Sequence, residues 1–317
     1  MQFYDIFNGD ADGICALHQL RLTEPRASVL VTGVKRDIAL LERVDAAAGD
    51  ELTVLDISFA RNAEALGRLL ERGVTCRYFD HHFAGKVPSH PAFQAFIDTS
   101  PDVCTSLLVD RHLEGRQRVW AVVAAFGDNL AAAARAAAAS LGLSEQQLEQ
   151  LQELGECINY NAYGDSVDDL HYHPADLYRI LACYTDPFDF IGGEPVFDIL
   201  RNGCAEDLYR ASEIAPQPAT AACALYVLPD AQWSRRVSGL FGNRLAQQHP
   251  QRAHAVLTAR PGGYRVSVRA PIANPRGADQ LCRAFDSGGG RQGAAGIDLL
   301  PEDDFMRFVS AFRKAFD

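Results

Sequence analysis

Residues 74–83 read V-T-C-R-Y-F-D-H-H-F, an apolar run that ends in one carboxylate and two imidazoles. The run predicts a β-strand, because aromatic and branched side chains suit a pleated, buried sheet. Asp80, His81 and His82 then stand at the carboxyl end of that strand, where α/β proteins bind their ligands. We therefore expect this triplet to be part of a functional site.

Two other predicted strands also end in carboxylates. Asp10 and Asp12 lie in F-N-G-D-A-D-G, after the apolar run Phe3–Phe7, and Asp56 lies in V-L-D-I-S. Alternate residues of an extended chain face the same way, so Asp10 and Asp12 would project together. Gly13 allows a sharp turn into a helix whose N-terminus favours anions. Three strands thus bring acidic or imidazole side chains to one edge of a sheet.

The N-terminal part alternates between strand and helix patterns. Apolar runs predict strands at Phe3–Phe7, Val29–Val34, Leu52–Ile57, Val74–Phe79 and Ala95–Asp98. Helical patterns lie between them at Ile14–Leu22, Arg36–Val44 and Arg61–Glu71. This rhythm is the βαβ signature of an α/β fold with a doubly wound, mainly parallel sheet. A helical connection follows, from Cys104 to Ser212.

The chain is long enough for two domains. It has 317 residues, of which 48% are hydrophobic, so each domain can bury a core. The paired prolines of E-I-A-P-Q-P predict a linker at residues 213–220. We expect a first domain at residues 1–212 and a smaller C-terminal α/β domain at 221–317. In the latter, a hairpin would pair Ala253–Ala259 with Tyr264–Ala270.

Charge and cysteine content narrow the class of protein. The net charge is −11, but residues 216–317 carry +5, which leaves −16 for residues 1–215. A basic second part fits a lobe that holds an anion. The eight cysteines form no C-x-x-C pair, which argues against a structural zinc site. No uncharged stretch reaches the roughly 20 residues of a membrane span. We recognise no signal peptide, so we expect a cytoplasmic protein without a membrane partner.

The side chains at the sheet edge predict a metal site. Asp10, Asp12 and Asp56 would repel one another unless a cation lay among them. His81 adds an imidazole, and Asp128 in A-F-G-D-N adds a carboxylate after an apolar helix. Oxygen ligands with one imidazole and no thiolate suit Mn²⁺ or Mg²⁺. Each piece alone is more simply explained as a turn or a helix cap, and their joint order along the chain favours the metal site.

The motifs resemble those of the DHH phosphoesterase family over nearly the whole chain. D-A-D-G at 10–13, Asp56, the D-H-H triplet and Asp128 match its four motifs in order. In the C-terminal part, G-G-G-R-Q-G-A-A-G at 288–296, preceded by V-S-V-R at 266–269, is similar to the glycine-rich motif of its substrate-binding domain. Two metal ions about 3.5–4 Å apart can share a water and clamp a phosphoryl group, so phosphate-ester hydrolysis follows.

The resemblance implies a two-lobed enzyme with two Mn²⁺ ions, or Mg²⁺ in their place, between its lobes. By this analogy one ion is held by Asp10 and Asp56. The other ion is held by Asp12, Asp56, His81 and Asp128. The catalytic residues would be His82, which faces the substrate phosphate or the attacking water, and Asp80, which orients the imidazoles.

Substrate binding is assigned by the same analogy to the second domain. The implied residues are Arg269, Gly288, Gly289, Gly290 and Arg291. The glycines would let backbone N–H groups approach the substrate, and Arg291 would pair with a phosphate or stack on a base. Thr99, Ser100 and Thr105 lie where the family has a polar segment near the site, and helix capping explains Ser100 nearly as well.

Two positions depart from the family pattern. Phosphatase and oligonucleotidase members usually carry a histidine four residues before the first aspartate, where this chain has Ile6, which cannot bind metal. Asn8 is the nearest polar residue, and its amide oxygen is a weaker ligand. The first ion is therefore expected to be loosely held or to be completed by another side chain. Where the family commonly has a histidine after the three glycines, Arg291 favours a more negatively charged substrate.

The predicted function is that of a Mn²⁺-dependent phosphodiesterase, a 3′–5′ exonuclease or oligonucleotidase acting on short oligonucleotides or linear dinucleotides. One alternative is a phosphomonoesterase acting on 3′-phosphoadenosine 5′-phosphate, and another is a pyrophosphate or polyphosphate hydrolase. A non-enzymatic alternative is a nucleotide-binding regulatory module whose catalysis has decayed at Ile6 and Asn8. The oligomeric state stays open, with a homodimer among the candidates.

Overall fold

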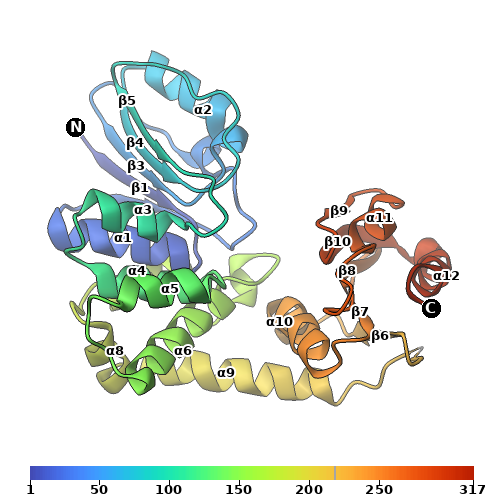
Figure 1. Ribbon diagram of the computed structural model, residues 1–317. Helices are drawn as coiled ribbons and strands as arrows, with labels where there is room; N and C mark the ends of the chain where they lie inside the picture. The colour runs from blue at the N-terminus through green and yellow to red at the C-terminus, as the bar shows by residue number, and fades with distance from the viewer. Residues whose placement is uncertain (218) are drawn as a thin grey trace. The chain divides into compact units, whose positions relative to one another are not determined.

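The structure is a computed structural model that describes residues 1–217 and 219–317 (Figure 1). The chain divides into two compact units, the first unit Met1–Asn202 and the second unit Gly203–Asp317. Helix α9 (Pro195–Ser212) ends just before the linker predicted at 213–220, of which Pro218 lies outside the described residues. The domain boundaries expected from the sequence stay a prediction.

A five-stranded sheet forms the centre of the first unit, with strand order β2-β1-β3-β4-β5. The strands are β1 (Phe3–Phe7), β2 (Val29–Val31), β3 (Glu51–Leu55), β4 (Thr75–Asp80) and β5 (Phe93–Ile97). Every pair of neighbours is parallel, which confirms the predicted α/β class and parallel sheet. The chain adds β2 on one side of β1 and β3 on the other. The switch point of the sheet therefore lies between β1 and β3.

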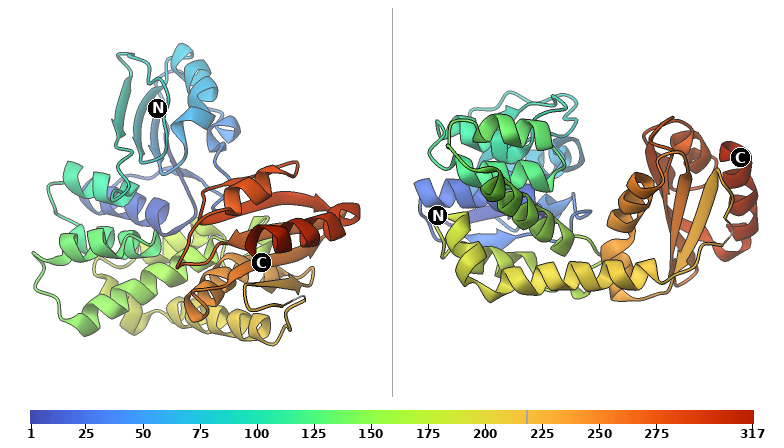
Figure 2. Two further views of the ribbon diagram at one scale, coloured as in Figure 1. Left: turned by 45° about the vertical axis from the view of Figure 1, so that its right-hand side comes forward. Right: turned by 60° about the horizontal axis from the view of Figure 1, so that its bottom comes forward.

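Helices cover both faces of this sheet, as a doubly wound fold requires (Figures 1 and 2). The 3-10 helix η1 (Leu40–Arg43) and α2 (Phe59–Glu71) pack on one face. The other face is covered by α1 (Ala11–Thr23), α3 (Thr105–His112) and α7 (Pro174–Leu181). Behind them pack α4 (Arg118–Gly127), α5 (Ala131–Ala138), α6 (Glu145–Asn161) and α8 (Pro187–Gly193). A further 3-10 turn, η2 (Val167–Asp169), follows α6.

Alternation along the strands explains why both faces are apolar. In β1, Ile6 belongs to the core under α2, and Phe7 belongs to the core under α1. Successive side chains of a strand point to opposite faces, so a strand covered on both sides reads as a continuous apolar run. Such a run was the signal from which the strands were predicted.

The helix predicted at Arg36–Val44 is wrong, because residues 36–39 are not helical and only the 3-10 turn η1 forms after them. Neighbouring segments take the hydrogen bonds that such a helix would need. The amide of Asn62 in α2 accepts from the N–H of Leu41 at 3.1 Å and donates to the carbonyl of Ile38 at 2.6 Å. Side chains distant in sequence thus override a local helical pattern.

A second five-stranded sheet, with order β6-β7-β8-β10-β9, forms the second unit. Its strands are β6 (Cys223–Leu228), β7 (Ala253–Arg260), β8 (Gly263–Arg269), β9 (Gly288–Gly290) and β10 (Ala294–Pro301). Its helices are α10 (Gln232–Gln248), α11 (Ala278–Arg283), η3 (Glu302–Asp304) and α12 (Phe305–Phe316). The predicted hairpin is present as the antiparallel pair β7 and β8. The right-hand view of Figure 2 shows α10 in orange and α12 in red on opposite faces of this sheet.

Among the helices of residues 1–217 and 219–317, none combines the length and the apolar character that a membrane span requires.

Candidate metal centre

The predicted site residues of the first unit follow the strand ends that flank the switch point. Asp10 lies soon after β1, Asp56 directly after β3, and His81 directly after β4. Since β1, β3 and β4 are neighbours in a parallel sheet, their carboxyl ends meet at one edge. Open α/β sheets bind their ligands at this edge, next to the switch point.

Asp128 reaches the same edge from the end of α4. A glycine allows this approach, because a Cβ on Gly127 would lie 2.5 Å from the Cβ of Ala11 and 2.8 Å from the carbonyl oxygen of Gly155. The missing side chain lets α4 pack closely against α1 and α6. Asn129, with a left-handed φ of 60°, then ends the helix beside Asp128.

Asp10 and Asp12 both bind backbone N–H groups. Asp10 is the N-cap of α1, and its Oδ1 accepts from the N–H of Asp12 at 3.1 Å and of Gly13 at 3.0 Å. The two oxygens of Asp12 accept from the N–H groups of Thr105 and Ser106, each at 2.7 Å. Asp10 therefore caps its own helix, and Asp12 fixes the start of α3 against α1. Two of the amides that the sequence offered to a substrate anion are thus already bound by Asp10.

Asp56 occupies a strained backbone position. Its φ of 58° lies in the left-handed region, which costs free energy for a non-glycine residue and recurs at functional sites. Its N–H donates to the carbonyl of Phe79 at 3.0 Å, which ties the bend to β4. The hydroxyl of Thr105 donates to Asp56 Oδ1 at 3.1 Å. The carboxylate is therefore fixed at both its backbone and its side chain.

A backbone carbonyl orients the ring of His81. Nδ1 lies 2.9 Å from the carbonyl oxygen of Val103, so Nδ1 donates and Nε2 keeps its lone pair for a ligand. Nε2 lies 3.4 Å from Asp56 Oδ1 and 3.7 Å from Asp128 Oδ2. Ligand atoms of Asp12, His81 and Asp128 all lie within 4.8 Å of one another. This group has the size and composition of a site for one divalent ion.

Asp80 orients His82 but not His81. Its Oδ1 accepts from Nδ1 of His82 at 2.7 Å and from the N–H of His82 at 3.1 Å, and its Oδ2 caps α2 at the N–H of Phe59. Burial alone would lower the pKa of His82, but the hydrogen bond and charge of Asp80 outweigh it and raise this pKa. The His82 side chain is 40% exposed. His82 also lies close enough to Asp56 and His81 to be an alternative metal ligand.

The structure adds a cation that the sequence analysis did not identify. Nζ of Lys35, which follows β2, lies 2.6 Å from Asp10 Oδ2, 3.3 Å from Asp128 Oδ1 and 3.2 Å from Asn159 Oδ1. Burial alone would lower the pKa of Lys35, but Asp10 foremost among its neighbours raises it well above its ordinary value. A signal for Lys35 was present, since it directly follows a predicted strand. Nothing in the sequence marks Asn159.

Ile6 stands at the position where the family has a histidine, and its side chain packs in a hydrophobic core. Ile6 is fully buried among side chains of β3, α2 and η1. The side-chain amide of Asn8 donates to the carbonyl of Lys35 at 3.1 Å, and its Oδ1 is buried without a hydrogen bond to any described residue. The neighbour that the sequence analysis expected in place of the histidine thus supports the backbone of Lys35.

The electrostatics of the cluster favour a further cation. Burial and then the charges of Asp12 and Asp10 raise the pKa of Asp56 well above its ordinary value. Burial also raises the pKa of Asp128, against the opposing effect of Lys35. A bound divalent ion would remove the repulsion that causes these shifts and keep both groups ionised. The buried carboxylates and the oriented imidazole therefore fit a divalent metal ion.

The substrate-binding residues predicted in the second unit lie in one sheet and in the turn between two of its strands. Gly288–Gly290 form the edge strand β9, and Arg269 at the end of β8 pairs with Ala294 at the start of β10. Arg291 is exposed in the turn between β9 and β10. The guanidinium of Arg269 donates to Asn243 Oδ1 at 2.7 Å. The sheet thus brings both arginines and the glycine strand to one end.

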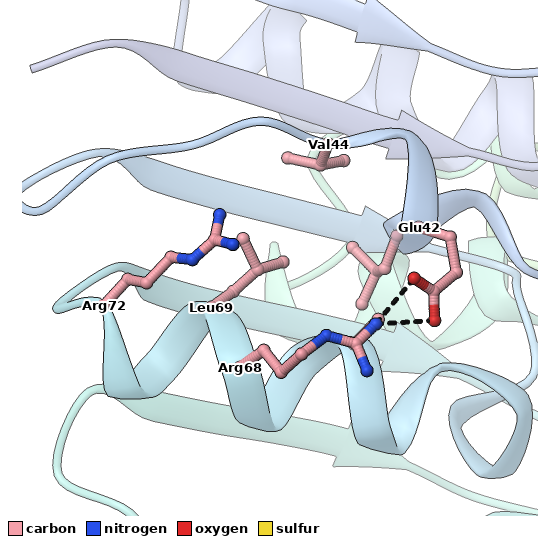
Figure 3. A pocket seen from close by; sticks show the side chains of 7 residues that line it. Glu42, Val44, Arg68, Leu69 and Arg72 are labelled. Atoms are coloured by element: carbon pink, nitrogen blue, oxygen red, sulfur yellow. Dashed lines mark hydrogen bonds and ion pairs between the residues drawn. The ribbon is translucent and has the colours of Figure 1, made fainter.

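A separate hollow lies between η1 and α2 (Figure 3). Arg68 and Arg72 line it together with Leu69 and Val44. Figure 3 shows the guanidinium of Arg68 directed at the carboxylate of Glu42, which lies 2.6 Å away. Because this charge is already paired, the hollow offers little attraction to an anion.

Several solved structures share this fold, including the following three. A crystal structure of exonuclease RecJ bound to manganese matches with a TM-score of 0.65 and 18% identity, over 99% of this chain and 90% of that chain. The pGpG-specific phosphodiesterase PggH of Vibrio cholerae matches with a TM-score of 0.57 and 14% identity, over 98% of this chain and 97% of that chain. An exopolyphosphatase-related protein of Bacteroides fragilis matches with a TM-score of 0.51 and 13% identity, over 99% and 91%.

No protein-family model and no curated protein matches the sequence. At identities of 13% to 18%, the likeness to the solved structures shows the fold alone. The resemblance to DHH phosphoesterases expected from the sequence is therefore confirmed for the fold.

Proposed function

We propose that this chain is a metal-dependent phosphoesterase, and more closely a phosphodiesterase that acts on linear dinucleotides or short oligonucleotides. The observation that carries the proposal is the cluster of buried carboxylates and an oriented imidazole at the switch point, next to the pair of Asp80 and His82. A fold shared with a manganese-bound exonuclease and a pGpG-specific phosphodiesterase supports the same class of chemistry.

The residues assigned to the ion are Asp12, Asp56, His81 and Asp128, and the ion is Mn²⁺ or Mg²⁺. When bound, such an ion lowers the pKa of a water and offsets charge on the phosphoryl group. Neighbouring groups of the chain hold these side chains in place. The carbonyl of Val103 fixes the His81 tautomer, and the hydroxyl of Thr105 fixes Asp56.

His82 is assigned the proton that the leaving group needs. Hydrolysis of a diester adds the oxygen of water to phosphorus and breaks a P–O bond, so the departing oxygen must take up a proton. Asp80 raises the pKa of His82 and so keeps more of its imidazolium form near neutral pH. Because Nδ1 is bound to Asp80, Nε2 is the nitrogen left for the substrate.

Substrate recognition is assigned to Arg269, Arg291 and the glycines 288–290 of the second unit. Strand β9 is at the edge of its sheet, so N–H groups on its outer side can be offered to a substrate, except that of Gly288, which donates to the carbonyl of Phe285 at 3.1 Å. Arg291 supplies a permanent cation for a phosphate. In this proposal residues 1–212 form the catalytic domain and residues 221–317 the substrate-binding domain. The cytoplasmic location and a homodimer stay predictions.

Short substrates are favoured over long single-stranded DNA. A long DNA track needs an extended basic groove, whereas residues 1–215 carry a net charge of −16. A second candidate function, hydrolysis of polyphosphate or pyrophosphate, is favoured only by the likeness to the exopolyphosphatase-related protein.

The test is one Mn²⁺-supplemented assay over a panel of substrates. The panel holds a linear dinucleotide, a five-nucleotide RNA, a long single-stranded DNA, 3′-phosphoadenosine 5′-phosphate, a cyclic dinucleotide and pyrophosphate. We expect the fastest turnover on the dinucleotide or the short RNA. His81→Ala should abolish it, and the matched variant of the exposed His90, His90→Ala, should not. Full activity in His81→Ala would refute the site, and faster pyrophosphate cleavage would favour the second candidate.

The same measurement distinguishes the proposed enzyme from a regulatory module without catalysis. Such a module would turn over no member of the panel with Mn²⁺ present, although nucleotides could still bind.

A further inference from the structure

Both oxygens of Asp10, the residue expected to hold the first of two ions, already have partners within the protein. Its Oδ1 accepts two backbone N–H groups of α1, from Asp12 and Gly13. Its Oδ2 lies 2.6 Å from Nζ of Lys35, and the residue is 2% exposed. Within the described part of the chain, one group able to hold a metal comprises Asp12, His81 and Asp128, another comprises Asp56, His81 and His82, and neither contains Asp10.

Three oxygens surround the ammonium group of Lys35. Besides Asp10 Oδ2, these are Asp128 Oδ1 at 3.3 Å and Asn159 Oδ1 at 3.2 Å. An ammonium group has three hydrogens to donate, so these acceptors match its full donor capacity. Lys35 is therefore placed to hold carboxylates of the centre, rather than to reach out to a substrate phosphate.

The backbone of Lys35 is fixed on both sides. Its N–H donates to the carbonyl of Ala162 at 2.9 Å, and its carbonyl accepts from the amide of Asn8 at 3.1 Å. Nζ also lies 6.0 Å from the centre of the Tyr163 ring, whose hydroxyl accepts from Asn159 at 2.9 Å. The segments that follow β1 and end α6 thus both contact this lysine and hold its ammonium group in a fixed position.

Neither residue near the position of the missing family histidine is a strong first-ion ligand. Ile6 packs in the core under α2. Asn8 donates its amide nitrogen to the carbonyl of Lys35, and its Oδ1, which is buried without a hydrogen bond to any described residue, is an amide oxygen and a weaker ligand than a carboxylate. An ammonium between Asp10 and Asp128 neutralises charge where a metal ion would otherwise do so. The remaining carboxylates, Asp12 and Asp56, lie on the side of His81.

We propose that Lys35 replaces one of the two metal ions, so that the centre binds a single divalent ion through Asp12, Asp56, His81 and Asp128. Lys35 acts as a positioning residue that holds Asp10 and Asp128. This inference rests on the proposed function, because it concerns the same centre. It changes the expected chemistry from a two-ion clamp to one ion supported by a fixed cation.

The test measures the number of Mn²⁺ ions per chain by equilibrium dialysis and elemental analysis, with the electron paramagnetic resonance spectrum as a second readout. The wild-type chain should bind about one ion and show no spin coupling, since coupling needs two ions about 3.5–4 Å apart. Lys35→Met frees Asp10 Oδ2, so its count should rise to about two with a coupled spectrum. Lys86→Met, at an exposed loop lysine, is the matched control and should bind as the wild type does.

Two results would overturn the inference. One is a wild-type chain with two spin-coupled ions, which needs no variant and stands even if Lys35→Met does not fold. The other is a folded Lys35→Met chain that still binds one ion. A wild-type chain that binds no Mn²⁺ would refute the metal-dependent function itself, and this outcome is distinct from both.

Discussion

Replacement of His82 by glutamine tests whether His82 is a proton donor or a metal ligand. In the structure His82 Nδ1 is bound to Asp80 at 2.7 Å, yet His82 also lies within ligand distance of Asp56 and His81. As a general acid, His82 should contribute ~10²–10⁴-fold to kcat and little to metal binding. We therefore expect His82→Gln to lower kcat by that factor while the Kd for Mn²⁺ stays unchanged.

The hydrogen bond between Asp80 and His82 allows the loss of kcat in Asp80→Asn to be predicted. A hydrogen bond to a charged group contributes about 1.5–3 kcal/mol, so Asp80→Asn should lower kcat by roughly 10–100-fold. Asparagine can still accept the N–H of Phe59, which keeps the start of α2 in place. Because Asp80 acts through His82, adding Asp80→Asn to His82→Gln should cause little further loss.

The assay combines steady-state hydrolysis of a dinucleotide at saturating Mn²⁺ with a calorimetric Mn²⁺ titration of each variant. His90→Gln, at an exposed loop position, is the matched control. If His82→Gln weakens Mn²⁺ binding in proportion to its loss of kcat, His82 is a ligand and the assignment is refuted. Fully additive losses in the double variant would contradict the coupling to Asp80.

Three further predictions concern the supports of the centre and the stability of the fold. Thr105→Val removes the hydroxyl that holds Asp56 and should weaken Mn²⁺ binding by about 10–100-fold in a titration, and unchanged affinity would contradict that role. A Cβ on Gly13 would lie 2.2 Å from a backbone carbonyl, so Gly13→Ala should lower the unfolding free energy by ~1–3 kcal/mol in urea, whereas Gly67→Ala, with nothing nearby, should not. Burial lowers the pKa of His18 from 6.5 to about 4. Since only the unfolded chain takes up this proton between those values, stability should fall by up to ~3 kcal/mol as the pH drops from 6.5 to 4. His18→Gln should flatten this part of the urea-measured curve, and an unaltered slope would exclude His18 as its source.

The parallel class of the sheet and the site residues at the ends of three of its strands were predictable because their signals are local. The run Phe3–Phe7 was placed with its bounds correct, and Asp10, Asp56 and His81 were expected at strand ends, where they lie. A buried parallel strand is apolar on both faces and therefore readable from a short window. Parallel connection then places successive carboxyl ends at one edge without further information.

Prediction from short stretches of sequence failed where residues distant in the chain form the hydrogen bonds that decide the local structure. The pattern at Arg36–Val44 is helical in isolation, but Asn62 captures backbone groups of Ile38 and Leu41. The glycines 288–290 gave no strand signal either, since glycine suits strands poorly, yet pairing with β10 makes them β9.

The candidate ligand types, their order along the chain and the class of fold could be read from the residues alone, because these depend on residue chemistry and on short-range periodicity. Which charges meet depends on the folded chain. Lys35 and Asn159 are 124 residues apart, and Lys35 and Asp128 are 93 residues apart, so no local pattern couples them. In the folded chain the ammonium of Lys35 lies on Asp10, where the sequence alone led us to expect the first of two metal ions.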